Sequence, residues 1–357
     1  MKICHIVHGL PESAGTTAYV LGIAKVQIAL GHDVTIATFN DAVGIKNEGF
    51  VLICAKKYED IEDCWDVVHI HALWSICQIK SMLWCQKRAY RYVISVHGSL
   101  MPRVFAKSPL KKWVFYWLFL KGNIKKACAI HCTSEYERQV CEKLGFEGPF
   151  IVAPLGIDMP KVIDRKSGKP CRTVLFVGRL GEEKGLVNLL DVWKVLPRDG
   201  WRLVLAGPDW LGYKKVLDDK MLNESIDGVE FTGAVYGDKK DALYRSADIF
   251  VLPSPMENFS MVVLEALAYG VPAIATKGTP WGGLVEYRCG WWIDQGVDAL
   301  KTALQSAMSI DDVARSEMGD RGRNLAKNKY SWASIAAEVL DGYRGVIEGC
   351  CRGGQPS

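Results

Sequence analysis

The sequence TVLFVGRLGEEKG at residues 173–185, followed by LVNLLDVWKVL at 186–196, has the pattern of a buried strand, a short turn and a helix. Residues 173–177 are almost entirely apolar, which is typical of a strand covered on both faces of a parallel sheet. The same alternation of short apolar runs and helical segments continues on both sides of this stretch. It predicts an α/β fold with parallel sheets and right-handed crossovers.

Two series of predicted strands flank a polar, proline-containing stretch at 158–170 that we interpret as a linker. The predicted strands are 2–7, 34–39, 66–70, 92–96 and 129–132 in the first series, and 173–177, 202–206, 229–232, 249–252 and 273–276 in the second. We therefore predict two Rossmann-like, doubly wound domains, at 1–160 and 171–330, facing each other across a cleft at the carboxyl ends of their sheets. A last helix at 331–349 is expected to cross back to the first domain.

Composition narrows the class of protein. The 357 residues suffice for two domains, and a net charge of +4 is far from that of a dedicated nucleic-acid binder, so no nucleic-acid partner is expected. No signal peptide is recognisable, and no apolar run approaches the roughly 20 residues that span a membrane. The twelve cysteines form no CxxC pair. We interpret them as reduced thiols of a cytoplasmic protein without a metal site.

Two cations follow the strand at 173–177. Gly178 allows close approach of the backbone to a ligand, and Arg179 and Lys184 place two positive charges at the carboxyl end of the strand. Such charges suit a diphosphate leaving group. Two surface cations beside an incidental glycine are the structural alternative.

Two glutamates lie around a predicted helix start in PSPMENFSMVVLEALAYG at 253–270. Glu257 precedes the helix, and Glu265 lies within it. A helix N-terminus offers free N–H groups that suit a phosphate or sugar hydroxyls. Capping or solvated glutamates remain the alternative for this pair alone.

The first half offers two further strand ends. HGLPESAGTT at 8–17 forms a glycine-containing turn before a helix, with Gly15 and Thr16 best placed to reach a phosphate, although it lacks the GxGxxG pattern. VHGSLMP at 96–102 follows another strand, so His97 is expected to point toward the same cleft. We expect most other histidines to be structural.

Together these segments resemble the retaining glycosyltransferases of family 4, which have the GT-B fold, and in particular the bacterial surface-polysaccharide type. The resemblance spans nearly the whole chain. It rests on VGRLGEEKG at 177–185, FTGAVYG at 231–237, ENFSMVVLE at 257–265, YSW at 330–332, SVHGSLMP at 95–102 and HCTSEYERQV at 131–140. Ser13-Ala14-Gly15 and Leu155 depart from patterns common in the family.

The resemblance implies a role for each candidate residue. Arg179 and Lys184 would stabilise the departing diphosphate, Glu257 would contact the transferred sugar, and His97 would lie near the reacting centre. Glu265 would bind the ribose. The other implied donor-binding residues are Gly15, Thr16, Gly178, Phe259, Ser260 and Met261. No metal or cofactor is implied, because the nucleotide-diphosphate-sugar is a substrate.

The implied acceptor is a glycan or a polyprenyl-diphosphate-linked glycan. KSPLKKWVFYWLFLKGNIKK at 107–126 surrounds an aromatic run with lysines. It fits peripheral binding to anionic lipid at the inner face of the cell membrane, or a buried helix with solvated lysine ends. Three alternative functions stay open: a sugar-nucleotide epimerase on the same fold, a nicotinamide-dependent oxidoreductase, and a silent sugar-nucleotide-binding subunit.

Overall fold

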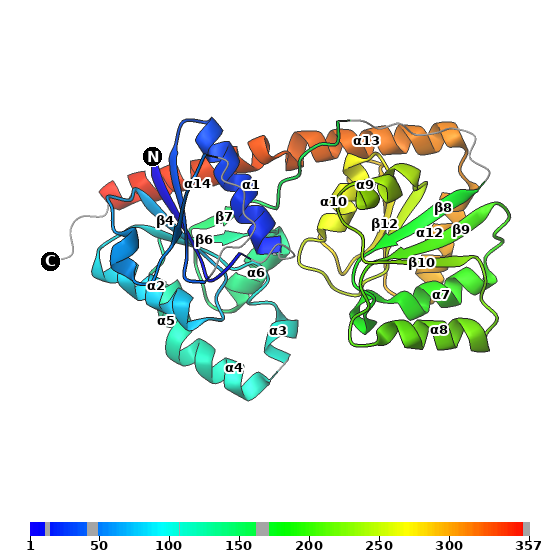
Figure 1. The fold of residues 1–357 in the computed structure, drawn as a ribbon, viewed down its shortest axis with the longest axis horizontal. Helices are drawn as coiled ribbons and strands as arrows, with labels where there is room; N and C mark the ends of the chain where they lie inside the picture. Colours follow the sequence, from blue (N-terminus) through cyan, green and yellow to red (C-terminus); the bar gives the residue numbers. More distant parts are fainter. Residues whose placement is uncertain (11–14, 41–48, 107, 162–170, 353–357) are drawn as a thin grey trace. The chain divides into compact units, whose positions relative to one another are not determined.

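The computed structural model describes residues 1–10, 15–40, 49–106, 108–161 and 171–352, and it divides into two compact units (Figure 1). Unit 1 combines Met1–Gly156 with the chain from Trp332 onward, and unit 2 is Ile157–Ser331. The C-terminal helix thus belongs to the same unit as the N-terminus.

Unit 1 is built on one parallel sheet. Among its described residues, seven strands pair in the order β3-β2-β1-β4-β5-β6-β7. The strands are β1 (Lys2–Val7), β2 (Asp33–Thr38), β3 (Val51–Cys54), β4 (Val67–His71), β5 (Tyr92–Ser95), β6 (Ala129–Cys132) and β7 (Phe150–Val152). The helices are α1 (Gly15–Ala29), α2 (Ile76–Lys87), α3 (Pro102–Ala106), α4 (Pro109–Phe115), α5 (Lys121–Ile124), α6 (Glu135–Lys143) and α14 (Trp332–Arg352), with a 3₁₀ turn at Tyr58–Ile61 and a π-helical turn at Tyr116–Leu120.

Unit 2 repeats this plan. Its described residues form a six-stranded parallel sheet in the order β10-β9-β8-β11-β12-β13. The strands are β8 (Arg172–Val177), β9 (Trp201–Ala206), β10 (Val229–Gly233), β11 (Ile249–Leu252), β12 (Ala273–Thr276) and β13 (Gly290–Ile293). The helices are α7 (Leu186–Val195), α8 (Tyr213–Asn223), α9 (Gly237–Ser246), α10 (Met261–Ala268), α11 (Gly283–Glu286), α12 (Val297–Ser309) and α13 (Asp312–Tyr330), with a 3₁₀ turn at Glu182–Lys184.

Each sheet grows outward in both directions from its first strand. The order therefore reverses between β1 and β4 in unit 1 and between β8 and β11 in unit 2. Ligands of open α/β sheets bind beyond the carboxyl ends of the strands at such a switch point. The predicted class, α/β with two doubly wound parallel sheets, is confirmed.

The inner strands explain why this part of the fold is predictable. All four residues of β5, β6, β11 and β12 are buried, as their largely apolar sequences predict. Three edge strands were not predicted: β3, β7 and β13. Each is short and at most partly buried, so its sequence carries little apolar signal.

Helix α14 packs on unit 1 through its first residue and its middle. The Trp332 ring lies so close to Gly22 of α1 that a Cβ on that glycine would come within 2.2 Å of it. Tyr343, farther along α14, is fully buried. Figure 1 shows α14 crossing behind α1, with which it is in contact, while α3 and α4 lie away from the sheet of unit 1. Within the described residues, no helix has both the length and the apolar character needed to cross a bilayer.

Candidate functional site

The loop after β8 carries the first predicted cation. Arg179 is exposed, and its guanidinium carbon lies 4.4 Å from the centre of the Trp210 ring. Glu183 lies 3.4 Å from the same guanidinium. Stacking on an indole face orients an arginine while leaving its N–H groups accessible. Arg179 is thus held, exposed, at the carboxyl edge of the sheet by Trp210 and Glu183.

Lys184 and Glu257 form an ion pair between two loops of unit 2. Lys184 Nζ lies 2.5 Å from Glu257 Oε1, and the two side chains are only 15% and 13% exposed. The loops can meet because Gly185 has φ +68° and no side chain: a Cβ there would lie 2.5 Å from the Pro253 carbonyl oxygen. The loop after β8 and the loop after β11 therefore place a cation and a carboxylate together at the switch point.

The N-terminus of α10 lies directly after Glu257 in the chain. Phe259 is buried, and its carbonyl oxygen accepts a hydrogen bond from Trp281 Nε1 at 2.6 Å. Ser260 takes a left-handed backbone, φ +70°, before the helix begins at Met261. Its Oγ is buried and has no hydrogen-bond partner among the residues described. The first turn thus combines helical N–H donors with a hydroxyl held in place by the backbone.

Glu265 is held on α10 by two side chains of α9. Lys240 Nζ and Tyr244 Oη lie 2.6 Å from its two carboxylate oxygens. Burial, followed by the charge of Glu265, raises the pKa of Tyr244 well above its usual range, so the phenol keeps its proton and donates it. Sequence reasoning missed both partners, although their four-residue spacing places them on one face of a helix.

The predicted residues of unit 1 occupy two places. Gly15 is the exposed first residue of α1, where an added Cβ would meet nothing within 4 Å, and Thr16 is half-buried. The departure at Ser13 and Ala14 lies outside the described residues. His97 follows β5 with φ +44°.

Glu137 holds the turn that contains His97. Its buried carboxylate accepts hydrogen bonds from the backbone N–H of Gly98 and from the N–H of Thr133, the latter at 2.6 Å. Burial raises the pKa of Glu137, and these backbone donors act in the opposite direction. The Glu137 carboxylate therefore joins the turn that contains His97 to the start of α6 by hydrogen bonds. The S-x-x-E spacing of Ser134 and Glu137 is a sequence signal for this helix start.

Five histidines of unit 1 gather on one face of its sheet: His5, His69, His71, His97 and His131. Burial lowers the pKa of His5 to about 4, of His131 to about 4 and of His97 to about 3. Burial and the neighbouring histidines lower the pKa values of His69 and His71 well below the ordinary value. The cluster is therefore neutral at pH 7.

Three of these histidines are close enough to hold a metal ion, because ring nitrogens of His5, His69 and His71 lie within 4.8 Å of one another. All six of their ring nitrogens already have hydrogen-bond partners. A bound ion would have to displace these bonds. We interpret the group as a hydrogen-bond network.

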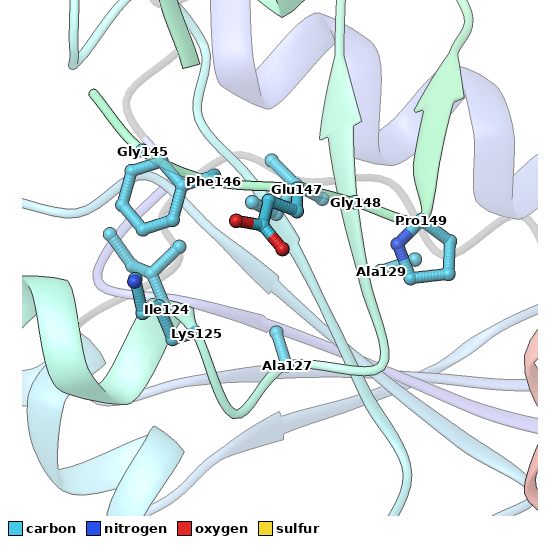
Figure 2. Close-up of a pocket in the computed structure, with 10 residues that line it drawn as sticks. Ile124, Lys125, Ala127, Ala129, Gly145, Phe146, Glu147, Gly148 and Pro149 are labelled. Atoms are coloured by element: carbon cyan, nitrogen blue, oxygen red, sulfur yellow. The ribbon is translucent and has the colours of Figure 1, made fainter. Parts of the chain in front are cut away.

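A cavity of about 210 Å³ in unit 1 lies elsewhere. Figure 2 shows the Glu147 carboxylate pointing into it, between Phe146 and Pro149. Its lining includes Ala129, the first residue of β6, and Pro149, just before β7. The cavity thus lies at the amino ends of the strands, the edge opposite to that which binds ligands in such sheets.

The predicted residues therefore fall into two sets. In unit 2, Lys184 and Glu257 are in contact. The same two loops carry Gly178, Arg179, Phe259 and Ser260, and Met261 and Glu265 lie on α10. In unit 1, Gly15 and Thr16 begin α1 and His97 follows β5. The sequence did not indicate Trp210, Lys240, Tyr244 or Glu137 as their partners.

Comparison with family models assigns the two halves of the chain separately. Residues 161–325 match the model described as Glycosyl transferases group 1, and residues 13–160 match Glycosyltransferase Family 4. The chain belongs to these glycosyltransferase families. Their boundary at 160/161 lies close to the boundary of the two units at Gly156/Ile157.

Curated relatives of this glycosyltransferase come from archaea, bacteria and plants. The uncharacterized glycosyltransferase MJ1607 of Methanocaldococcus jannaschii is 33% identical over 184 residues, covering 50% of this chain and 46% of that protein. The GDP-mannose:cellobiosyl-diphosphopolyprenol alpha-mannosyltransferase of Xanthomonas campestris is 23% identical over 293 residues, covering 79% and 74%. The match to MJ1607 thus spans about half of that relative's length. These matches give no support to the epimerase alternative.

Solved structures show the same fold. Sucrose-phosphate synthase from Thermosynechococcus elongatus has a TM-score of 0.76 at 20% identity, covering 98% of this chain and 99% of that one. Anabaena Alr3699/HepE in complex with UDP has a TM-score of 0.79 at 16% identity, covering 97% and 100%. The glycosyltransferase described here has the GT-B fold, as predicted.

Proposed function

We propose that this protein is a retaining glycosyltransferase that moves a sugar from a nucleotide-diphosphate-sugar to a glycan or lipid-linked glycan in bacterial surface-polysaccharide biosynthesis. The observation that supports this most is the Lys184–Glu257 pair, which lies at the switch point of unit 2 just before the N-terminus of α10. Arg179 adds a second cation on the same loop as Lys184.

Lys184, Arg179 and the N-terminus of α10 each suit one part of a nucleotide-diphosphate-sugar during transfer. The bond between the anomeric carbon and the diphosphate oxygen breaks, and negative charge develops on the leaving diphosphate. Lys184, Arg179 and the first N–H groups of α10 stabilise that charge. In same-face attack, the leaving phosphate oxygen accepts the proton of the acceptor hydroxyl, so the new bond forms on the face from which the old one departs.

The ion pair also links sugar and diphosphate recognition. A phosphate bound to Lys184 shares the ammonium group with Glu257, so the carboxylate can turn one oxygen toward the sugar hydroxyls. Glu265 receives the ribose hydroxyls with its carboxylate oriented by Lys240 and Tyr244. Charge neutralisation comes from the protein, and we propose that transfer requires no divalent ion. EDTA should therefore leave turnover unchanged.

The donor and acceptor classes are proposed from the relatives. The Xanthomonas campestris relative is named for a GDP-mannose donor and a diphosphopolyprenol acceptor. Another, 27% identical over 176 residues, is the lipopolysaccharide 1,2-N-acetylglucosaminetransferase of Salmonella typhimurium. Both act on surface or lipid-linked glycans by name. We assign this chain the same acceptor class and a UDP- or GDP-sugar as donor.

The segment Leu110–Lys126 supports a lipid-linked acceptor. Its apolar side chains include Leu110, Trp117 and Leu118, which are 77%, 59% and 69% exposed. Lysines accompany them: Lys121 Nζ lies 3.9 Å from the centre of the Trp117 ring, and Lys111, Lys125 and Lys126 are exposed. The alternative, a buried helix with solvated lysine ends, would bury these side chains as well, whereas here Tyr116, Leu120 and Ile124 are the ones that pack into the core. Lys107 lies outside the described residues. We propose that the exposed face rests on anionic lipid.

One experiment separates these functions. The protein is incubated with UDP-, GDP- and ADP-sugars and a polyprenyl-diphosphate-linked sugar, and nucleoside diphosphate and glycan are quantified together. A retaining transferase releases one nucleoside diphosphate per sugar transferred and keeps the donor's anomeric configuration, read by NMR. Interconversion of the nucleotide-sugar without acceptor would support the epimerase instead, and binding without turnover would support a silent subunit.

A further inference from the structure

A chain of hydrogen bonds runs from Tyr343 on α14 to the backbone of Ala153. Tyr343 Oη lies 2.5 Å from His69 Nδ1, and His69 Nε2 lies 2.6 Å from Ser95 Oγ. Ser95 Oγ lies 2.5 Å from His131 Nδ1, and His131 Nε2 lies 2.8 Å from the Ala153 carbonyl oxygen. All four side chains are buried.

The direction of this chain follows from its carbonyl end. The Ala153 oxygen can only accept, so His131 carries its proton on Nε2. Neutral His131 then accepts at Nδ1 from the Ser95 hydroxyl, and Ser95 Oγ accepts from His69 Nε2–H. His69 Nδ1 is consequently an acceptor, and Tyr343 donates its only proton to it.

Gln27 on α1 meets the remaining histidines through its amide oxygen. Gln27 Oε1 lies 2.8 Å from His5 Nε2, and Gln27 Nε2 makes no direct hydrogen bond within the described part of the chain.

A second chain leads from Gln27 to His97. His5 Nδ1 lies 3.0 Å from His71 Nε2, and His71 Nδ1 lies 3.1 Å from His97 Nε2. Because Gln27 Oε1 can only accept, His5 holds its proton on Nε2 and accepts at Nδ1. By the same reasoning, His71 carries its proton on Nε2 and accepts at Nδ1. His97 therefore also carries its proton on Nε2. Nδ1 of His97 takes no part in either chain and keeps its lone pair.

We infer that Gln27 is a positioning residue that, through His5 and His71, fixes His97 as the Nε2–H tautomer. His97 then presents Nδ1 as a neutral hydrogen-bond acceptor. Such a nitrogen binds a hydroxyl, which can donate, and is unfavourable beside a phosphate oxygen, which can only accept. The assignment of the tautomer does not depend on the reaction. That the bound hydroxyl belongs to the transferred sugar rests on the proposed function.

The direct test is NMR of the full chain with ¹⁵N-labelled histidine at pH 7, using long-range ¹H–¹⁵N correlations that distinguish protonated from unprotonated ring nitrogens. The signals of His97 are assigned with His97→Gln. The expected result is protonated Nε2 and unprotonated Nδ1 for His5, His71 and His97 alike. A protonated Nδ1 on His97, which a reversed Gln27 amide would impose, overturns the inference.

Two substitutions test the part played by Gln27. Gln27→Glu keeps an acceptor next to His5, so His97 should keep its tautomer. Gln27→Met removes the acceptor, so His97 should show a mixture of both tautomers, while Gln86→Met, a half-buried control outside the network, should change nothing. An unchanged His97 spectrum in folded Gln27→Met contradicts the assignment to Gln27. If that variant does not fold, wild type and Gln27→Glu still decide.

The readout separates this inference from the proposed function. Absence of sugar transfer with the expected tautomer would refute the function and leave the network standing. Transfer with the opposite tautomer would refute the network alone.

Discussion

Lys184 Nζ lies 2.5 Å from Glu257 Oε1 and joins the loop after β8 to the loop before α10 in unit 2. The pair is the point at which the parallel sheet, the left-handed turn at Gly185 and the start of α10 come together. Its two charges are well shielded from solvent, so an approaching diphosphate meets an ammonium group that is already oriented.

Loss of either cation should reduce turnover. Lys184→Ala and Arg179→Ala should each lower kcat by about 10²–10³-fold, the scale of removing one preorganised donor from a developing negative charge. Glu257→Ala should be comparably damaging, with folding intact by circular dichroism. Lys194→Ala, which breaks an exposed pair with Glu224, is the matched control and should be near wild type. Turnover like wild type in all three site variants would refute the assignment.

Glu265 should govern donor affinity rather than the chemical step. Tyr244→Phe removes one hydrogen bond that orients the carboxylate, and Glu265→Ala removes the carboxylate itself. Both should raise KM for the nucleotide-sugar with a smaller effect on kcat, because the ribose is bound equally in ground and transition states. Steady-state kinetics with varied donor measure the split. A fall in kcat at unchanged KM would place Glu265 in the chemistry instead.

The neutral histidines should make unit 1 sensitive to mild acid. His5 and His131 have pKa values of about 4, and His97 of about 3, below the ordinary value near 6.5. The unfolded chain therefore binds more protons below pH 6.5, and stability is lost as the pH falls from there toward 4. The raised pKa of Glu137 changes stability in the opposite direction, but Glu137 is a single group and the histidines are several.

Urea unfolding from pH 7 to pH 4.5 measures this effect. The midpoint should fall steeply in wild type, and equally in His8→Gln, because His8 is exposed and outside the network. A midpoint that stays level between pH 6.5 and pH 4.5 would show that the histidines are not held neutral by the fold.

The exposed face of Leu110–Lys126 should bind anionic lipid. In liposome flotation at low salt, wild type should float with anionic vesicles and stay soluble with neutral ones. The double variant Trp117→Ser and Leu118→Ser should lose most of this binding. Leu222→Ser, which removes a side chain that is 80% exposed on α8 of unit 2, should retain it. Wild type that remains wholly in the soluble fraction would contradict the membrane proposal.

The inner strands and the loops that follow them were predictable because each carries its signal within a few consecutive residues. A continuous apolar run shows a doubly covered strand, and Gly178, Arg179 and Lys184 come directly after one. The same local reasoning found Glu257 and Glu265, since both lie within one strand–loop–helix segment.

The histidine network could not be predicted in this way, because it depends on which strands are neighbours. The parallel register sets His5 beside His69 and Ser95 beside both His71 and His131, although these residues are far apart in the chain. Tyr343 joins them from a helix 274 residues after His69. A single sequence gives no strand order and no register, so it showed these histidines only as separate buried side chains.

The most direct test of the account is a crystal structure of the protein with UDP or GDP, whichever gives the larger thermal stabilisation. We predict a diphosphate oxygen about 3 Å from Lys184 Nζ, others facing Arg179 and the first N–H groups of α10, and ribose hydroxyls on Glu265. Phosphates bound away from Lys184 and α10, with the Lys184–Glu257 pair untouched, would contradict it.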